Sequence, residues 1–484
     1  MYNWLSITKE SDYDKLASYL TEEFGGAQVI RRLRETMTDA VRGVLIESDY
    51  TDKDYRSTYY NYYAKKGRNY RADCVRLHFF DETIAFNEAT LDLRSKDERL
   101  EDHYFGYIVV RPTYYSTIGR SLLSPNIRRG ARGSIIHAKY KVHLLGHRLE
   151  VSGFPSMEQH SDISVCAHVA CWSVMRHYSE RYPQHKELLL HDITTLARDF
   201  DPGGVAPANG LVVAEAERIF QAAGTYPLVI AQDTADLEKF YRQLIAYLES
   251  GFPLFVAVPA RTHSVAAIGY AWRDDGPRKI KREQHAYDQA DAIVVVDDNH
   301  LPYLPIPTNA EAPSPTDYRA TDFDCFVVPL PEKVHFSAEV VDEFVGHFHT
   351  TLSQEFALPS GEDLVTRYFI TTASGLRDYV RRNASQFDAD LLQVVMQLRT
   401  AQFIWVVEYA SKAQWQAGHI AARAILDASA SPNDPLPVWF AHNAEGAIIF
   451  DRSSQATPPL ILSWKPTGVP LGRMERNLRP VRAK

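Results

Sequence analysis

A cysteine at an expected helix start is the first group in this sequence that could do chemistry. Residues 157–178 read MEQHSDISVCAHVACWSVMRHY and hold two thiols, Cys166 and Cys171. A catalytic thiol needs a lowered pKa, a base within hydrogen-bond reach, a group that orients the base, and donors for an oxyanion. A helix N-terminus lowers a thiol's pKa through its free N–H groups and its dipole. Cys166 follows polar residues that can begin a helix, so it is the candidate nucleophile.

The second cysteine has a different expected role. Five residues rotate a helix by about 140°, so the two thiols face different sides. Cys171 shares its face with a largely apolar stripe that includes Val174, Met175 and Tyr178. A buried cysteine behaves as a small hydrophobic residue. We therefore expect Cys171 in the core and Cys166 at a cleft.

A base and an orienting acid are found on later apolar runs. His263 begins the run HSVAAIGY, and Asp297 ends the run AIVVVD, with Asp298 directly after it. A lone histidine at a strand start is usually structural, and an Asp-Asp pair at a strand end is usually a turn. A cysteine on an early helix, followed by histidine and acid on adjacent strands, is nevertheless the papain-type order. This order predicts a Cys166–His263–Asp297 triad, with Asp298 as the alternative orienter.

Other polar groups give weaker signals. His347 and His349 are two apart and do not share a helix face, so we expect no metal site there. The arginines of residues 120–132 could bind an acidic partner, but a solvated loop is favoured. No cofactor and no metal are expected. The four cysteines show no CxxC pair, which argues against a disulfide framework or a zinc site.

Bulk composition limits the class of protein. The 484 residues suggest two to four domains, and a hydrophobic content of 45% with 24% charged residues is typical of globular proteins. The net charge of -8 disfavours a general nucleic-acid coat. No apolar run reaches the roughly eighteen residues that a membrane helix needs, and the polar N-terminus lacks a secretion signal. A reducing cytoplasm is the expected location.

The elements that must position the candidate residues suggest an α+β protein in three parts. Residues 1–150 and 336–484 are expected to be α+β accessory domains. In residues 151–335, helices come first and four strand-like runs come last: PLFVAV, SVAAIGY, AIVVVD and CFVVPL. Within the flanking parts, residues 1–50 are expected to be helical, as are residues 415–428.

The central third of the chain resembles a known family. QHSDISVCAHVACWSVMRHY is similar to the catalytic segment of the bacteriocin-processing (double-glycine leader) peptidases and their stand-alone relatives, within the papain-like cysteine peptidase superfamily. NGLVVAEAERIFQAAG resembles a later helix of that family, and the runs that carry histidine and acid resemble its strands. The similarity covers roughly residues 155–330. It implies a papain-like domain with N-terminal helices and a C-terminal antiparallel sheet.

The resemblance also implies roles for four residues. Cys166 would be the nucleophile, His263 the general base and Asp297 the group that orients the imidazole. Gln159 would donate to the oxyanion beside the backbone N–H of Cys166. Gln159 stands seven residues before the cysteine where the family has six, so His160 is an alternative donor. Two further departures are an alanine at 167, where glycine is usual, and Asp298, where proline is frequent.

The expected function is cysteine-dependent acyl chemistry, most simply hydrolysis of a peptide bond through a thioester. A protein or peptide is the expected substrate, and the oligomeric state stays open. The family's transporter-fused members process leader peptides during export, but this chain has no Walker-type phosphate loop and no expected membrane span. The alternatives are a deamidase or acyltransferase on the same fold, and a catalytically inactive papain-fold module that binds or regulates.

Overall fold

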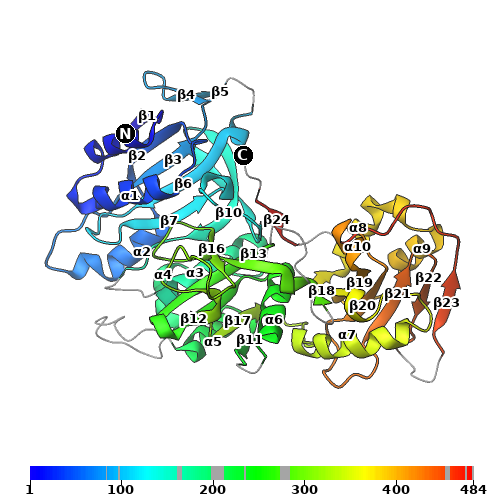
Figure 1. The fold of residues 1–484 in the computed structure, drawn as a ribbon. Helices are drawn as coiled ribbons and strands as arrows, with labels where there is room; N and C mark the ends of the chain where they lie inside the picture. The colour runs from blue at the N-terminus through cyan, green and yellow to red at the C-terminus, as the bar shows by residue number, and fades with distance from the viewer. Residues whose placement is uncertain are drawn as a thin grey trace.

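Three large sheets organise the chain, and helices pack between and around them (Figure 1). Most strand pairs are antiparallel. The computed structural model describes residues 1–82, 84–95, 99–160, 166–197, 212–233, 236–272, 284–452, 458–474 and 477–481.

The N-terminal sheet has two central strands, β3 (Cys74–Phe80) and β6 (Tyr104–Val110), that are buried at every position. Its strands in spatial order are β1 (Tyr2–Ser6), β2 (Gly43–Tyr50), β3, β6, β7 (Ile118–Leu123), β10 (His147–Ser156) and β9 (Ala138–Leu144). The accompanying elements are helices α1 (Gly26–Thr36) and α2 (Lys53–Asn61) and the small hairpin β4 (Ile84–Asn87) and β5 (Asp92–Ser95).

The expectation that residues 1–50 are helical is only partly met. Helix α1 forms, but β1 and β2 pair with each other as antiparallel strands, with Trp4 opposite Leu45. The cause is long-range pairing, because β2 also pairs with β3 and so lies in the interior of the sheet.

In the central region most helices precede the sheet along the chain. The helices are α3 (Cys166–Arg181), α4 (Leu190–Leu196), α5 (Val213–Ala222) and α6 (Leu237–Glu249). The strands in spatial order are β11 (Tyr226–Ala231), β17 (Cys325–Leu330), β12 (Leu254–Val258), β13 (His263–Trp272), β15 (Ala290–Val296) and β16 (Leu304–Pro307). The four predicted apolar runs are all strands of this sheet, and β11, which lies between α5 and α6 along the chain, was not anticipated.

Helix α3 is the central helix of the molecule. It packs against β12 and β13 on one side and against β9 and β10 of the N-terminal sheet on another. Residues 167–178 of this helix are all buried, which explains why its sequence is apolar on most sides. The buried Trp172 donates a hydrogen bond to Asp54 at 3.0 Å, so the helix is also fixed by a polar contact.

The C-terminal sheet forms a separate lobe, at the right of Figure 1. Its strands in spatial order are β14 (Gln284–His285), β18 (Leu364–Thr372), β19 (Phe403–Ser411), β20 (Ala422–Asp427), β21 (Val438–Asn443), β22 (Gly446–Ile449) and β23 (Leu460–Ser463). Its helices are α7 (Ala338–Leu352), α8 (Ala373–Arg382), α9 (Ala389–Gln397) and α10 (Lys412–Gln416).

The prediction of a helix over residues 415–428 is wrong. Helix α10 ends at Gln416, and β20 is a fully buried strand between β19 and β21. Its alanines favour a helix locally. Pairing with two neighbours, and the ion pair of the buried Arg423 with Glu408 on β19, favours the strand.

Several strands connect the three regions, either by extending past a boundary or by pairing with a strand of another region. β10 continues beyond residue 150 as part of the N-terminal sheet. β14, which lies between β13 and β15 in sequence, pairs in parallel with β18 of the C-terminal sheet. The short strand β8 (Ser134–Ile135) pairs with β13, and β24 (Arg479–Pro480) pairs with β8. The three regions are therefore joined through backbone hydrogen bonds.

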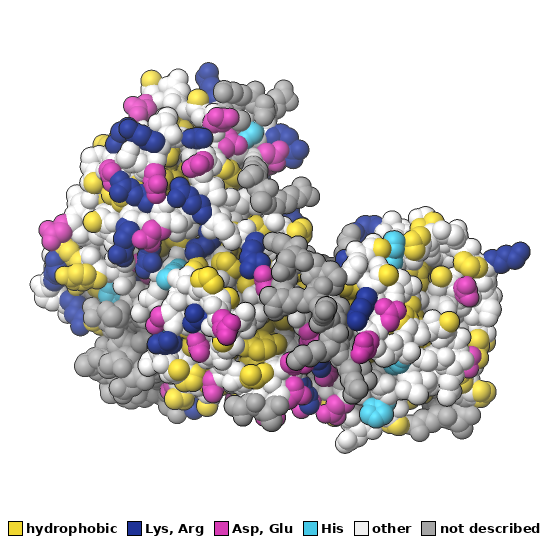
Figure 2. Space-filling view, in the orientation of Figure 1, with side chains coloured by type: hydrophobic (Ala, Val, Ile, Leu, Met, Phe, Trp, Pro, Cys, Tyr) yellow, Lys and Arg dark blue, Asp and Glu magenta, His cyan; other side chains and the backbone are white. Residues whose placement is uncertain are grey.

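The surface carries both signs of charge. On the face shown in Figure 2, lysine and arginine side chains alternate with acidic ones over the N-terminal lobe and do not gather into one basic patch. Among the residues that the structure describes, no helix combines the length and the apolar character needed to span a bilayer.

Candidate active site

The four residues predicted for catalysis line one cavity. Gln159, Cys166, His263 and Asp297 all face a cleft of about 920 Å³ between the N-terminal end of α3 and one end of the central sheet. They come from four separate segments of the chain. The fold therefore brings together the side chains that the sequence pattern grouped.

Cys166 is the first residue of α3 and is partly exposed to the cleft. Its Sγ lies 4.0 Å from the carbonyl oxygen of Thr262. Cys171 is fully buried, and burial raises the pKa of its thiol. Burial likewise raises the pKa of Cys325, to about 11, and that of Cys74. The two thiols of α3 thus lie in different environments, as helical rotation predicts.

Adjacent antiparallel strands position the histidine and the acid. His263 is the first residue of β13, and Asp297 directly follows the last residue of β15. Ala266 of β13 pairs with Val296 of β15. This register places the side chains of His263 and Asp297 at the same end of the sheet. The residue before the histidine, Thr262, has a left-handed backbone with φ of 49°. A β-branched residue rarely adopts this conformation, and it turns the chain sharply into β13 beside Cys166.

The imidazole of His263 is held between a thiol and two carboxyl groups. Its Nε2 lies 3.2 Å from Oδ1 of Asp297 and 3.8 Å from Oδ1 of Asp298. Burial lowers the pKa of His263, but the ion pair with Asp297, the neighbouring thiol of Cys166 and the charge of Asp298 raise it to about 11. The imidazole therefore carries a proton through the neutral pH range. Because Nε2 faces the acids, Nδ1 is left for chemistry at Cys166.

Asp297 is the better-supported carboxylate. It is 2% exposed, and it accepts hydrogen bonds from the backbone of Asn299 at 2.8 Å and from the hydroxyl of Tyr318 at 2.6 Å. Burial opposes its ionisation, but His263 and Tyr318 lower its pKa to about 2. The charged form of Asp297 is thus stabilised where it contacts the imidazole.

The pKa of Asp298 is shifted in the opposite direction from that of Asp297. It is 4% exposed, and neither carboxyl oxygen has a hydrogen-bond partner among the described residues. Burial raises its pKa to about 7, with the charge of Asp297 adding to the effect and that of His263 opposing it. Of the two candidate orienters, Asp297 therefore lies closer to the imidazole and is the more fully ionised.

The structure separates the two candidate oxyanion donors. Gln159 lines the cleft together with Cys166. His160 is buried, and its Nε2 is hydrogen-bonded to the hydroxyl of Tyr63 in the N-terminal region. Burial and the charge of Arg111 lower the pKa of His160 to about 3. Gln159 is accordingly the side chain of the pair that faces the candidate nucleophile.

The N-terminal region holds the segment that carries Gln159. The carboxylate of Glu158 accepts a hydrogen bond from the backbone of Ile118 at 3.1 Å, and the guanidinium of Arg111 donates to the Glu158 carbonyl at 3.1 Å. Together with the contact of Tyr63 with His160, these bonds fix the residues on both sides of Gln159. The first sheet thus helps to build the cleft of the central region.

Three groups in this site are close enough to share a cation. The nearest ligand atoms of His263, Asp297 and Asp298 all lie within 4.8 Å of one another. Imidazole and carboxylates are ligands that zinc and other transition metals accept. The sequence did not predict a metal here, and this is the group among the described residues that could hold one.

Sequence reasoning missed several residues of the cleft. Tyr318 supports Asp297 from a loop twenty-one positions away, and a lone tyrosine in a proline-rich stretch gives no signal of that role. His300 also lines the cleft. Its position two residues after Asp298 is a signal in the sequence that marks it as a candidate site residue. An apolar wall is formed by Val212, Val213 and Ala257, with Val212 63% exposed.

The chain was also compared with models of known protein families, with curated proteins and with solved structures, and no match is found in any of the three.

Proposed function

We propose that the protein is a cysteine-dependent hydrolase of the papain-like type that cleaves peptide bonds. The observation that carries the proposal is the geometry of one cleft, in which a partly exposed thiol at a helix start faces an imidazole held by a buried carboxylate. The order of helices before an antiparallel sheet is consistent with the resemblance to the leader peptidase-like family. All four cysteines are free, which fits a reducing compartment.

The first half reaction forms a thioester. The thiolate of Cys166 attacks the substrate carbonyl, and the resulting oxyanion is stabilised by the side-chain amide of Gln159 and the backbone N–H of Cys166. The raised pKa of His263 keeps its imidazole protonated, so it can deliver that proton to the leaving amine. Asp297 fixes the ring through Nε2 and stabilises its positive charge.

The second half reaction releases the acyl group. After the amine has left, the neutral imidazole of His263 accepts a proton from water, and the hydroxide attacks the thioester. The thiolate of Cys166 is the leaving group, so the resting state is restored. Resolution by an amine, or attack on a side-chain amide, would give acyl transfer or deamidation on the same residues.

The experiment that tests this function measures digestion of unfolded, fluorescently labelled casein by the purified full-length protein. We expect release of peptides by the wild type and a loss of at least about a thousandfold in Cys166→Ser. Cys74→Ala is the matched control, because Cys74 is buried in the N-terminal sheet and should leave activity in place. A metal chelator should have no effect on a thiol-based reaction.

Three results would oppose the proposal. Equal activity of the wild type and Cys166→Ser would exclude the thiol as nucleophile. Loss of activity on chelation, restored by zinc, would favour a metal held by His263, Asp297 and Asp298. If casein is untouched, a peptide aldehyde that binds the wild type but not Cys166→Ser would still detect the activated thiol, and its failure would favour a binding module.

A further inference from the structure

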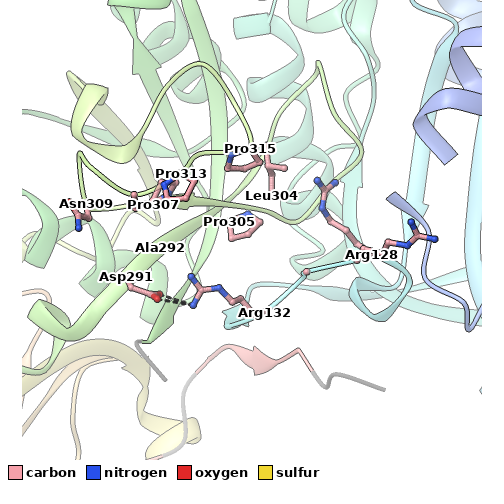
Figure 3. A pocket seen from close by; sticks show the side chains of 13 residues that line it. Arg128, Arg132, Asp291, Ala292, Leu304, Pro305, Pro307, Asn309, Pro313 and Pro315 are labelled. Carbon is pink, nitrogen blue, oxygen red and sulfur yellow. Dashed lines mark hydrogen bonds and ion pairs between the residues drawn. The ribbon is translucent and has the colours of Figure 1, made fainter. Parts of the chain in front are cut away.

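A second cavity lies beside the cleft and has a different character. It has a volume of about 530 Å³ and lies, open to solvent on one side, between residues 128–132 of the N-terminal region, the strands β15 and β16, and residues 309–315 (Figure 3). Pro315 lines both this cavity and the cleft that contains Cys166. A chain that leaves the cleft over Pro315 would therefore enter the second cavity.

The charge of the cavity is opposite to that of the whole molecule. Its lining includes Arg128, Arg129 and Arg132 but one acidic residue, Asp291, whereas the chain has a net charge of -8. Arg129 is already paired with Glu10 and Asp39 outside the lining. Arg128 and Arg132 are therefore the cations that a ligand could use. Arg132 donates to both carboxyl oxygens of Asp291 through Nη1, at 2.9 and 2.8 Å. A guanidinium has five N–H donors, so Arg132 keeps donors for a ligand.

Arg128 is a cation without an acidic partner. Its Nη1 donates to the carbonyl oxygens of Leu301 and Pro302, the latter at 3.1 Å, and its Nε is buried without a hydrogen-bond partner. Among the described residues, no carboxylate forms an ion pair with it. Burial lowers its pKa to about 10, with the charge of Asp297 opposing the effect. A carboxylate that entered the cavity would compensate this desolvated charge.

The walls of the cavity favour recognition through side chains. Pro305 and Pro307 lie on β16, the strand at the edge of the central sheet. Proline has no backbone N–H, so this edge cannot donate a regular ladder of hydrogen bonds to an added strand. Figure 3 shows the prolines across the cavity from Arg132, which forms its ion pair with Asp291. Rigid apolar walls that face an arginine suit an extended acidic segment.

We infer that this cavity binds an acidic side chain of the polypeptide substrate, several residues away from the bond that is cleaved. The inference names the substrate class of the same site and so rests on the proposed function. Arg128 and Arg132 would be the specificity-determining residues. Asp291 would compete with the ligand for Arg132.

The test uses the full-length Cys166→Ser protein and a fluorescein-labelled peptide of alternating glutamate and glycine, with a matched glutamine–glycine peptide. Fluorescence anisotropy at physiological ionic strength should show at least about tenfold tighter binding of the glutamate peptide. Arg132→Gln and Arg128→Gln should each weaken that binding by about tenfold. Asp291→Asn should strengthen it, and Arg381→Gln on the exposed face of α8 should leave it unchanged.

Arg128→Gln also removes the hydrogen bonds to the carbonyls of Leu301 and Pro302, so it could weaken peptide binding by disturbing the fold. Arg132→Gln and Asp291→Asn are therefore the variants that test the inference. Equal binding of the two peptides, or weakening by Arg381→Gln as much as by Arg132→Gln, overturns the inference. In the wild type, the glutamate peptide should slow alkylation of Cys166, and no protection would contradict the path over Pro315. If Cys166 proves inert while the binding pattern holds, the proposed function fails and the acidic-peptide site stands.

Discussion

Asp297 and Asp298 are neighbours in sequence and are both buried, yet the fold treats them differently. Asp297 receives hydrogen bonds from Asn299 and Tyr318 and faces the imidazole of His263, so its charged form is favoured. Asp298 lacks hydrogen-bond partners among the described residues, so its neutral form is favoured. We therefore expect substitution of Asp297 to change activity and substitution of Asp298 to change stability.

The first prediction concerns the pH dependence of catalysis. The ion pair with Asp297 helps to raise the pKa of His263, so Asp297→Asn should lower that pKa. The protonated imidazole would then be lost at lower pH, and the basic limb of kcat/KM should move down by more than about one pH unit. A pH–rate profile of both proteins measures this. An unchanged basic limb would show that Asp297 does not act on the imidazole.

The second prediction concerns stability. The folded protein raises the pKa of Asp298 from 3.8 to about 7, so the acid's contribution to stability is complete below pH 3.8 and is lost as the pH rises through 7. Asp298→Asn has no charge to bury. Its free energy of unfolding should therefore exceed that of the wild type by about 4 kcal/mol above neutral pH, with a smaller difference in acid. Urea unfolding at several pH values tests this, and parallel pH curves for the two proteins would contradict it.

At the scale of elements, helix α3 places one cysteine, Cys166, at the cleft and the other, Cys171, in the core. Its N-terminal residue faces the cleft, and its remaining turns fill the space between two sheets. Strands β13 and β15 then bring His263 and Asp297 to the same end of the sheet. The site depends on how these elements meet more than on any local motif.

The third prediction separates the two thiols of α3. Cys171→Ala removes a fully buried sulfur and should lower the free energy of unfolding by about 1–2 kcal/mol, with activity per folded molecule retained. Cys166→Ala should remove activity with little change in stability, because its side chain is partly exposed. Paired activity assays and denaturation curves give the comparison. Equal loss of activity in both folded variants would count against the assignment of Cys166.

The sequence predicted those elements whose patterns are local. The runs that became β12, β13, β15 and β17 are continuous apolar stretches, typical of buried strands. β20 was expected to be helical because its alanines carry no sign of the two strands beside it. The role of Tyr318 depends on a contact across the fold, so neither spacing nor residue type could reveal it. Residue type did raise an acidic partner for the arginines of residues 120–132, but the contacts of Arg128 with the carbonyls of Leu301 and Pro302 could not be read from the sequence.

At the scale of the whole molecule, a buried charge network joins the central region to the C-terminal lobe. Arg367 on β18 pairs with Glu249 of α6 at 2.6 Å and with Glu408 of β19 at 2.7 Å. Glu408 also pairs with Arg423 at 2.8 Å, and all four residues are nearly or fully buried. Helix α6 also packs against β13, so the lobe is connected to the strand that begins with His263.

The fourth prediction tests this connection. Arg367→Met would leave two buried carboxylates without their shared partner and should cost about 3–5 kcal/mol of unfolding free energy. Arg381→Met is the matched control, since its side chain is 74% exposed and should change stability very little. Urea unfolding measures both. A midpoint in Arg367→Met equal to that of the control would show that the network does not stabilise the junction.

The most direct test of the account is the rate at which each cysteine of the native protein is alkylated as a function of pH. Iodoacetamide labelling followed by peptide mapping reports all four thiols in one experiment. The geometry of the cleft predicts that Cys166 reacts faster than a free thiol below about pH 7, whereas Cys74, Cys171 and Cys325 are protected by burial. If Cys166 reacts no faster than a free thiol below that pH, the thiol is not activated and the proposed chemistry is wrong.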